Sequence, residues 1–181
     1  MEHEERSAIL KEADALYARG KLEEALELYR RVLAEDDTVA WAHSRTGAIL
    51  AQLGDLDAAE AHLRRAIELD PKLPQAYSNL GNVDYTRGAY EAALEKYKKA
   101  VELDPSNPTF YENLHAAYKR LGKIYEAVEA IKKAQQLKRL QVREQADRDM
   151  AQLKGSVKRR LGCLPGAVLL ALAALGWAFI V

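Results

Sequence analysis

The chain has 181 residues and lacks most of what builds disulfide frameworks and catalytic centres. Its single cysteine, Cys163, excludes an intramolecular disulfide framework and fits a reducing compartment for the body of the protein. The four histidines, His3, His43, His62 and His115, are scattered without metal-ligand spacing. Neither a nucleophile motif nor a phosphate-cradling glycine loop is present. We therefore expect no enzyme activity, no bound metal, no cofactor and no small-molecule substrate.

The formal net charge is zero, but the charges are unevenly distributed. Residues 1–131 hold 17 Lys/Arg and 24 Asp/Glu, residues 132–160 hold 10 and 3, and residues 161–181 hold no charged side chain. This pattern predicts an acidic body, a basic neck and an apolar tail. Binding of nucleic acid is not expected, because the body is acidic and lacks a basic face. The charged start of the chain, MEHEERSAIL, is no secretory signal, and its acidity argues against a transit peptide.

Identical or similarly large residues recur along the chain with a period of 34. The recurring positions are Gly20, Gly54, Gly88 and Gly122, then Ala25, Ala59, Ala93 and Ala127, and finally Tyr29, Leu63, Tyr97 and Ile131. A fixed period of this length is typical of an array of supersecondary units and not of one globular core.

Each unit has the pattern of a helical hairpin. In residues 74–105, apolar and small residues follow helical spacing in two blocks, which predicts helices near 75–87 and 91–103. Gly88 can take the left-handed conformation that ends the first helix, and Pro105 prevents the second from continuing.

These residues resemble the tetratricopeptide repeat. The third unit carries the signature at Tyr77, Leu80, Gly81, Gly88, Ala93, Tyr97, Ala100 and Pro105. The resemblance implies an all-α, right-handed α-solenoid of four hairpins, over residues 6–39, 40–73, 74–107 and 108–140, after a tail at residues 1–5. The first unit is weaker, because Ala13 stands where the first helix has glycine and Asp37 where the unit ends in proline.

Four packing predictions follow from the signature positions. Gly81 and Ala93 should lie where the two helices of a hairpin approach closely, because a bulky side chain there would hold them apart. Tyr77, Tyr97 and Tyr111 should fill the core between repeats. Asp84 stands at a position that usually carries a large residue, and we expect Tyr85 to take over its packing. His115 replaces the glycine of the fourth unit, and we expect it to be structural.

In this family the first helices of the hairpins line a concave groove that holds a peptide. The resemblance places the following candidate groove residues: Lys11, Trp41, Arg45, Gln75, Asn79, Asn82, Glu112, Asn113 and Arg120. Asparagine amides can pair with a peptide backbone, and Arg45 could hold a carboxylate. The lysine/asparagine clamp of chaperone-tail binders is essentially absent, since Leu10 and Ser44 stand where its first lysine would be.

Residues 141–160 are predicted to form a basic neck helix. Apolar residues in steps of four, four, three and four form one narrow stripe, at Val142, Ala146, Met150, Leu153 and Val157. We interpret this helix as a cap over the last hairpin, because the end of an array otherwise exposes apolar surface. A short coiled-coil seam is the alternative.

Residues 161–181 are uncharged and mostly apolar. As a helix they would extend about 31 Å, which matches a hydrocarbon core of about 30 Å. We therefore expect a transmembrane tail anchor. Lys158, Arg159 and Arg160 precede it and should keep the repeats on the cytoplasmic side. Cys163 would lie at the interface, where reversible acylation can occur, although a plain apolar cysteine is the simpler interpretation.

Together these features predict a tail-anchored tetratricopeptide adaptor that docks a partner protein or peptide in its groove at the cytoplasmic face of a membrane. One alternative is a structural or assembly subunit of a membrane complex. Another is a co-chaperone-like holdase without a carboxylate clamp.

Overall fold

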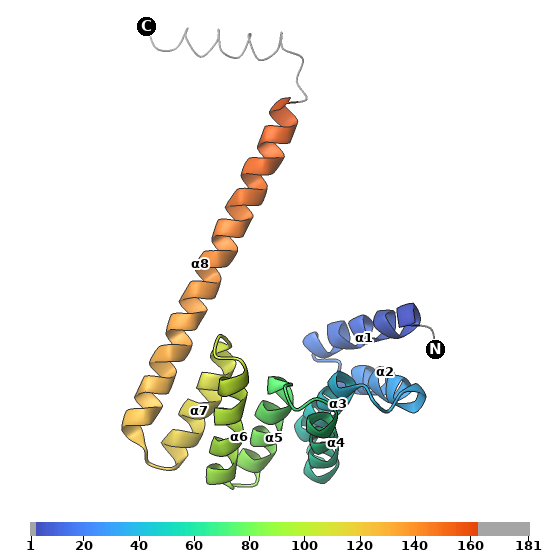
Figure 1. The fold of residues 1–181 in the computed structure, drawn as a ribbon, viewed down its shortest axis with the longest axis vertical. Coiled ribbons are helices and arrows are strands. Elements are labelled where there is room, and N and C mark those ends of the chain that lie inside the picture. The colour runs from blue at the N-terminus through green and yellow to red at the C-terminus, as the bar shows by residue number, and fades with distance from the viewer. Residues whose placement is uncertain (1–2, 163–181) are drawn as a thin grey trace, which may run out of the picture. The chain divides into compact units, whose positions relative to one another are not determined.

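The computed structural model describes residues 3–162, which form helices joined by short loops and contain no strand (Figure 1). The helices are α1 (His3–Ala18), α2 (Leu22–Glu35), α3 (Ala40–Leu53), α4 (Leu56–Leu69), α5 (Pro74–Thr86), α6 (Tyr90–Leu103), α7 (Pro108–Arg120) and α8 (Ile124–Gly162). Consecutive helices pair as hairpins 1 to 3, and α7 with the start of α8 forms hairpin 4. The predicted all-α array of helical hairpins is thereby confirmed over the described residues.

The 34-residue period fixes where the helices end. The four periodic glycines all have positive φ, at 75° for Gly20, 92° for Gly54, 82° for Gly88 and 71° for Gly122. Left-handed backbone is strained for residues with a Cβ, so glycine ends each first helix without cost and turns the chain into the second. The prediction made for Gly88 is confirmed at all four positions.

The loops between hairpins also repeat. Asp36, Asp70 and Asp104 each follow a second helix with nearly the same extended backbone, at φ −146°, −137° and −139° and ψ 95°, 93° and 90°. In all three cases the backbone N–H closes the last helical turn by donating to a carbonyl four residues earlier. An extended residue is what a following proline requires, and Pro71 and Pro105 occupy that place in the second and third loops.

The predicted close approach within a hairpin is present. A Cβ built on Gly81 would lie 2.6 Å from Tyr97 Cε1 and 3.2 Å from the Ala93 carbonyl oxygen. A Cβ on Gly47 would lie 2.6 Å from Leu63 Cγ and 2.9 Å from the Ala59 carbonyl oxygen. Glycine at this position therefore lets the second helix pack directly on the backbone of the first.

The core runs between the hairpins as two clusters of buried side chains. One joins hairpins 1 and 2 to α5, and the other joins α6 to hairpin 4. Tyr97 is 2% exposed, as predicted for a core residue, whereas Tyr77 and Tyr111 are only half-buried. Tyr85 packs against the second cluster, as predicted, and Asp84 beside it is also half-buried.

The chain divides after Leu137 into two units, residues 1–137 and 138–181. Residues 141–160 belong to α8, so the second helix of hairpin 4 and the predicted neck are one continuous helix of 39 residues. Within the neck, Val142, Met150 and Leu153 are 70%, 52% and 57% exposed. The cap over the last hairpin stays a prediction.

Among residues 3–162, no helix is both long enough and apolar enough to cross a membrane. The predicted anchor at residues 161–181 lies almost entirely outside the described residues, and so does Cys163.

Candidate functional site

The first helices of hairpins 1 to 3 together line a cavity of about 190 Å³. Its walls come from Tyr17 on α1, from Ala48, Ala51 and Gln52 on α3, and from Asn79, Asn82 and Thr86 on α5. The Gln52 amide donates a hydrogen bond of 2.8 Å to the Tyr17 hydroxyl, which ties α3 to α1 at the rim. Two predicted groove residues, Asn79 and Asn82, are therefore brought together with groups from three consecutive hairpins.

At the N-terminal end of this surface, Asp14 collects three donors. Its Oδ1 accepts from the Tyr29 hydroxyl at 2.7 Å and from Arg45 Nε at 3.0 Å, and its Oδ2 accepts from Trp41 Nε1 at 3.2 Å. The Arg45 guanidinium also lies over two rings, 4.2 Å from the Trp41 centroid and 4.8 Å from the Tyr17 centroid. Arg45 was predicted to hold a ligand carboxylate, but a carboxylate of the chain itself is already bound to it.

The tyrosine hydroxyl contact recurs in hairpin 3. Tyr97 donates to Asn82 Oδ1 at 2.8 Å, across the same 15-residue separation that joins Tyr29 to Asp14. Burial is the main reason why the pKa of both tyrosines is raised well above the ordinary value, and for Tyr29 the hydrogen bond to Asp14 adds to it. Both hydroxyls are therefore protonated donors at any physiological pH.

The two asparagines at equivalent positions of α5 and α7 have different surroundings. Asn113 Nδ2 donates to Ser78 Oγ at 3.0 Å and so links α7 to α5. Asn79 lies one repeat earlier and lines the cavity, and Ser44, the equivalent of Ser78, has its hydroxyl buried without a hydrogen-bond partner in the described structure. Asn113 thus has a structural partner, while Asn79 lines an open site.

The C-terminal end of the groove is basic. A cavity of about 580 Å³ is lined by Tyr85, His115, Ala116, Lys119 and Arg120. Arg120 stacks over the Tyr90 ring, 4.7 Å from its centroid, and donates to the Tyr90 hydroxyl. His115 Nδ1 lies 2.9 Å from the Ala127 carbonyl oxygen, where only a protonated nitrogen can bond, so His115 holds α7 to α8 as expected of a structural residue.

The remaining predicted site residues are placed as follows. Lys11 is exposed on α1 and lines a third cavity of about 330 Å³ with Asp14 and Val39. Gln75 and Glu112 are half-buried near the starts of α5 and α7. The predicted membrane-flanking residues Lys158, Arg159 and Arg160 belong to the end of α8, and their side chains lie outside the described structure.

Three residues of this surface, Asp14, Tyr17 and Lys119, are not among the candidate groove residues predicted from the sequence. One signal for Asp14 was available in the 34-residue register. Where the first helix has a polar residue at this register position, Asp14 or Asn82, the second helix has a tyrosine 15 residues later. Where the first helix has alanine, at positions 48 and 116, the second helix has Leu63 or Ile131. Such paired alternation indicates contact across the hairpin.

Comparison with known proteins agrees with this fold. A family model described as "TPR repeat" matches residues 13–54, 47–86 and 81–122, and one described as "Tetratricopeptide repeat" matches residues 111–139. No curated protein sequence matches the chain.

Solved structures with a similar fold include a crystal structure of MamA, with 28% sequence identity and a TM-score of 0.64, covering 76% of this chain and 81% of that one. MamA from Desulfovibrio magneticus RS-1 has 25% identity and a TM-score of 0.62, with coverage of 75% and 77%. The first TPR of Spaghetti (RPAP3), bound to the HSP90 peptide SRMEEVD, has 20% identity and a TM-score of 0.60, covering 67% of this chain and 97% of that one. At that identity the last comparison concerns the fold alone.

Proposed function

The chain belongs to the tetratricopeptide repeat family and is a protein-interaction scaffold of that type, and from this premise we propose that it is a membrane-anchored adaptor that docks an extended segment of a partner protein along the first helices of its hairpins. The observation that carries the proposal is the cavity shared by α1, α3 and α5. We infer binding and not catalysis.

The chemistry of the groove fits a peptide main chain. Gln52, Asn79 and Asn82 place amide groups around the 190 Å³ cavity, and an amide can both donate to and accept from a peptide backbone. Tyr17 lines the cavity, and the Arg45 guanidinium lies over both its ring and that of Trp41. Large aromatic side chains of this kind are typical of residues that dominate binding energy. A peptide-bound relative of the same fold, Spaghetti with the HSP90 peptide, shows that the fold accommodates such a ligand.

The proposed anchor is residues 161–181, supported by their length, their lack of charge and the basic residues before them. Confinement to a membrane raises the effective concentration of a partner in the same membrane without any new contact. This would let a groove of modest affinity act as an efficient adaptor.

Filling the cavity tests the docking site. Asn79→Trp places an indole in the 190 Å³ cavity, and Lys98→Trp places the same side chain on an exposed position of α6 as a control. Partners are cross-linked in intact membranes and identified by mass spectrometry. We expect Asn79→Trp to lose a discrete partner that the wild type and Lys98→Trp retain. A partner kept by Asn79→Trp would place the interface outside the groove and favour the structural-subunit alternative.

Truncation tests the anchor separately. A chain ending at Arg160 should move to the soluble fraction with its helical content intact, whereas the full chain should resist alkaline extraction of membranes. Release of the full chain by alkali would contradict the anchor and leave the docking proposal standing.

A further inference from the structure

The two ends of the groove carry different charges. At the N-terminal end Arg45 pairs with Asp14 at 3.0 Å, so its charge is balanced within the chain. At the C-terminal end Lys119 and Arg120 are exposed and line the cavity of about 580 Å³. Among residues 3–162 neither has an ion-pair partner, and no acidic side chain lines this cavity. The other first helices have no basic pair at the matching positions, which hold Tyr17 and Ala18, Ala51 and Gln52, and Tyr85 and Thr86.

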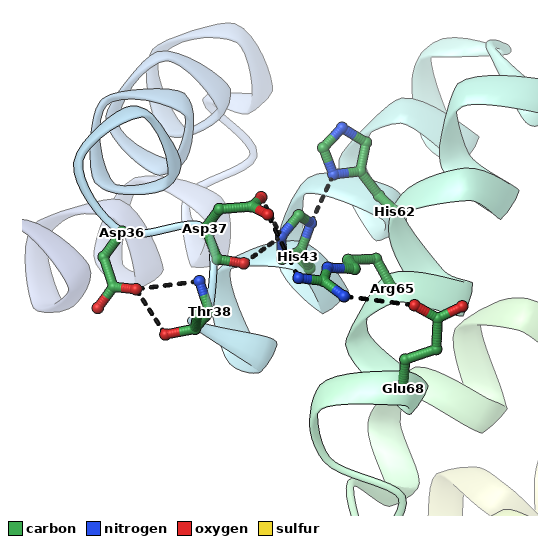
Figure 2. Close-up of polar contacts among 7 residues, drawn as sticks. All are labelled: Asp36, Asp37, Thr38, His43, His62, Arg65 and Glu68. Atoms are coloured by element: carbon green, nitrogen blue, oxygen red, sulfur yellow. Dashed lines mark hydrogen bonds and ion pairs between the residues drawn. The ribbon is translucent and has the colours of Figure 1, made fainter.

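Most arginines of the solenoid already have a carboxylate partner. At the first junction, Arg65 lies 3.4 Å from Asp37 Oδ2 and 3.4 Å from Glu68, as Figure 2 shows. Of the nine arginines in residues 3–137, the following six are paired in this way: Arg6, Arg31, Arg45, Arg64, Arg65 and Arg87. Arg120 is not paired and forms part of the wall of a cavity, so it is available to a ligand.

The guanidinium of Arg120 is held in place by tyrosine rings. It lies over the Tyr90 ring, 4.7 Å from the centroid, and its Nη2 donates to the Tyr90 hydroxyl. The Tyr85 ring packs edge-on against Tyr90, with the centroids 5.2 Å apart, and also lines the cavity. The donors on Nε and Nη1 make no described hydrogen bond. A guanidinium that is oriented beforehand loses little freedom when it binds a carboxylate.

His115 supplies an acceptor at the same wall. Its Nδ1 carries the proton, because it lies 2.9 Å from the Ala127 carbonyl oxygen, which can only accept. In the neutral ring Nε2 is then an acceptor, which suits a backbone N–H, whereas Lys119 and Arg120 can only donate. The wall therefore offers two cations to an anionic group and one acceptor to the backbone that carries this group.

The charge of the rest of the body limits the kind of anion. Residues 1–131 hold 17 Lys/Arg and 24 Asp/Glu, so the body repels a polyanion such as nucleic acid or a long acidic tract. A single carboxylate is not excluded in this way, because its ion pair at about 4 Å outweighs the field of charges more than about 10 Å away, which salt screens. One isolated acidic side chain is therefore the group that fits this cavity.

We propose that the cavity binds the carboxylate of one aspartate or glutamate in the docked segment, with Lys119 and Arg120 as its partners, and so fixes the register of the segment on the groove. The site is not the lysine/asparagine clamp, whose later basic positions hold Thr109 and Asn113 in this chain. The inference rests on the proposed docking function, but the cavity can be tested without it.

A small probe tests the cavity alone. The full chain in detergent micelles is titrated with acetyl-glutamate amide, and with acetyl-glutamine amide as the neutral match, while NMR follows the side chains of His115, Lys119 and Arg120. We expect saturating shifts with the glutamate probe only. Equal shifts with both probes, or none with either, would overturn the proposal, and this comparison needs no variant.

Two variants of equal charge locate the binding. Lys119→Gln with Arg120→Gln should bind the glutamate probe about tenfold more weakly, because it removes the charge-assisted hydrogen bonds. Arg19→Gln with Lys98→Gln removes the same charge at exposed positions that do not line the cavity, and it should bind as the wild type does. Equal weakening in both double variants would assign the binding to net charge and would contradict the site.

Selection of peptides by the full chain from a random ten-residue library tests the docked segment. Peptides that bind the wild type should share an acidic residue at one fixed position, and Lys119→Gln with Arg120→Gln should select peptides without this preference. Wild-type peptides with no acidic preference would overturn this inference and leave the docking function standing. If no peptide binds while the glutamate probe does, the cavity is confirmed as a carboxylate site and the docking function fails.

Discussion

Hairpins 1 and 3 differ from hairpins 2 and 4 at one pair of facing positions. In hairpins 1 and 3 a tyrosine of the second helix donates to a polar side chain of the first, Tyr29 to Asp14 and Tyr97 to Asn82. Hairpin 2 has Leu63 against Ala48 at the same positions, both buried. The same fold therefore tolerates a polar or an apolar pair there. In the polar version the tyrosine donates a hydrogen bond to the side chain of the first helix. In hairpin 1 that side chain, Asp14, also accepts from Trp41 and Arg45 of the next hairpin.

Removing Asp14, the polar side chain of this pair in hairpin 1, should have the largest effect on stability. Asp14→Ala leaves the fully buried Tyr29 without its acceptor and frees Trp41 and Arg45, and we expect a loss of about 3 kcal/mol in the free energy of unfolding. Chemical denaturation measures it. Asp14→Asn, which copies Asn82, should cost less. Adding Tyr29→Leu to Asp14→Ala recreates the apolar pair of hairpin 2 and should recover part of the loss; no recovery would show that the two versions are not interchangeable.

Adding a methyl group where the two helices of a hairpin approach closely should have the next largest effect on stability, in hairpin 2 as well as in hairpin 3. Gly47→Ala and Gly81→Ala should each lower the free energy of unfolding by about 2 kcal/mol, because the new Cβ meets Leu63 or Tyr97 at 2.6 Å. In hairpin 3 the clash also displaces the Tyr97 hydroxyl, so Tyr97→Phe should cost less in the Gly81→Ala background than alone. Gly155→Ala, where nothing lies within 4 Å, is the control and should not destabilise. Additive costs for Gly81→Ala and Tyr97→Phe would mean that the ring does not move.

Hairpin 3 also has a carboxylate where the other hairpins have Leu16, Leu50 and Tyr118. Burial raises the pKa of Asp84, so its ionised form costs stability at neutral pH. Asp84→Leu should raise the free energy of unfolding by about 1 kcal/mol. The folded state holds this proton more tightly, so the advantage of the variant should shrink as the pH falls toward 3.8, the ordinary pKa. Thermal melts of the wild type and the variant across this pH range measure the stability difference. A stability advantage that does not change with pH would mean that packing alone causes the gain.

The smallest expected effect is a difference in stability between alanine variants of two equivalent serines, Ser44 and Ser78. Ser78→Ala removes the acceptor of Asn113 and should cost about 1 kcal/mol, whereas Ser44→Ala removes a buried hydroxyl without a described partner and should be neutral or slightly stabilising. Equal costs for the two variants, measured by denaturation, would indicate that the Ser44 hydroxyl is bonded in solution.

Much of the fold was predictable because the end of each first helix has glycine in all four hairpins. These glycines have positive φ, which other residues rarely adopt, so their 34-residue period revealed the hairpins and their register. The candidate groove residues lie on the first helices, as predicted, but their hydrogen-bond partners could not be predicted. Arg45 and Asn113 contact Asp14 and Ser78 of the same chain, and ligand binding by these two residues stays a prediction. Such pairings depend on which residues of adjacent first helices meet.

The sequence by itself determined the number of hairpins, their boundaries and the uneven distribution of charge, since these depend on local backbone preference and on composition. Tertiary structure alone decided which polar groups satisfy one another. It joined Asp37, His43 and His62 from a loop and two helices, and Asp14 with Arg45 across two hairpins. A hydrogen bond depends on distances of a few tenths of an ångström, and only the packing of the assembled hairpins sets those distances.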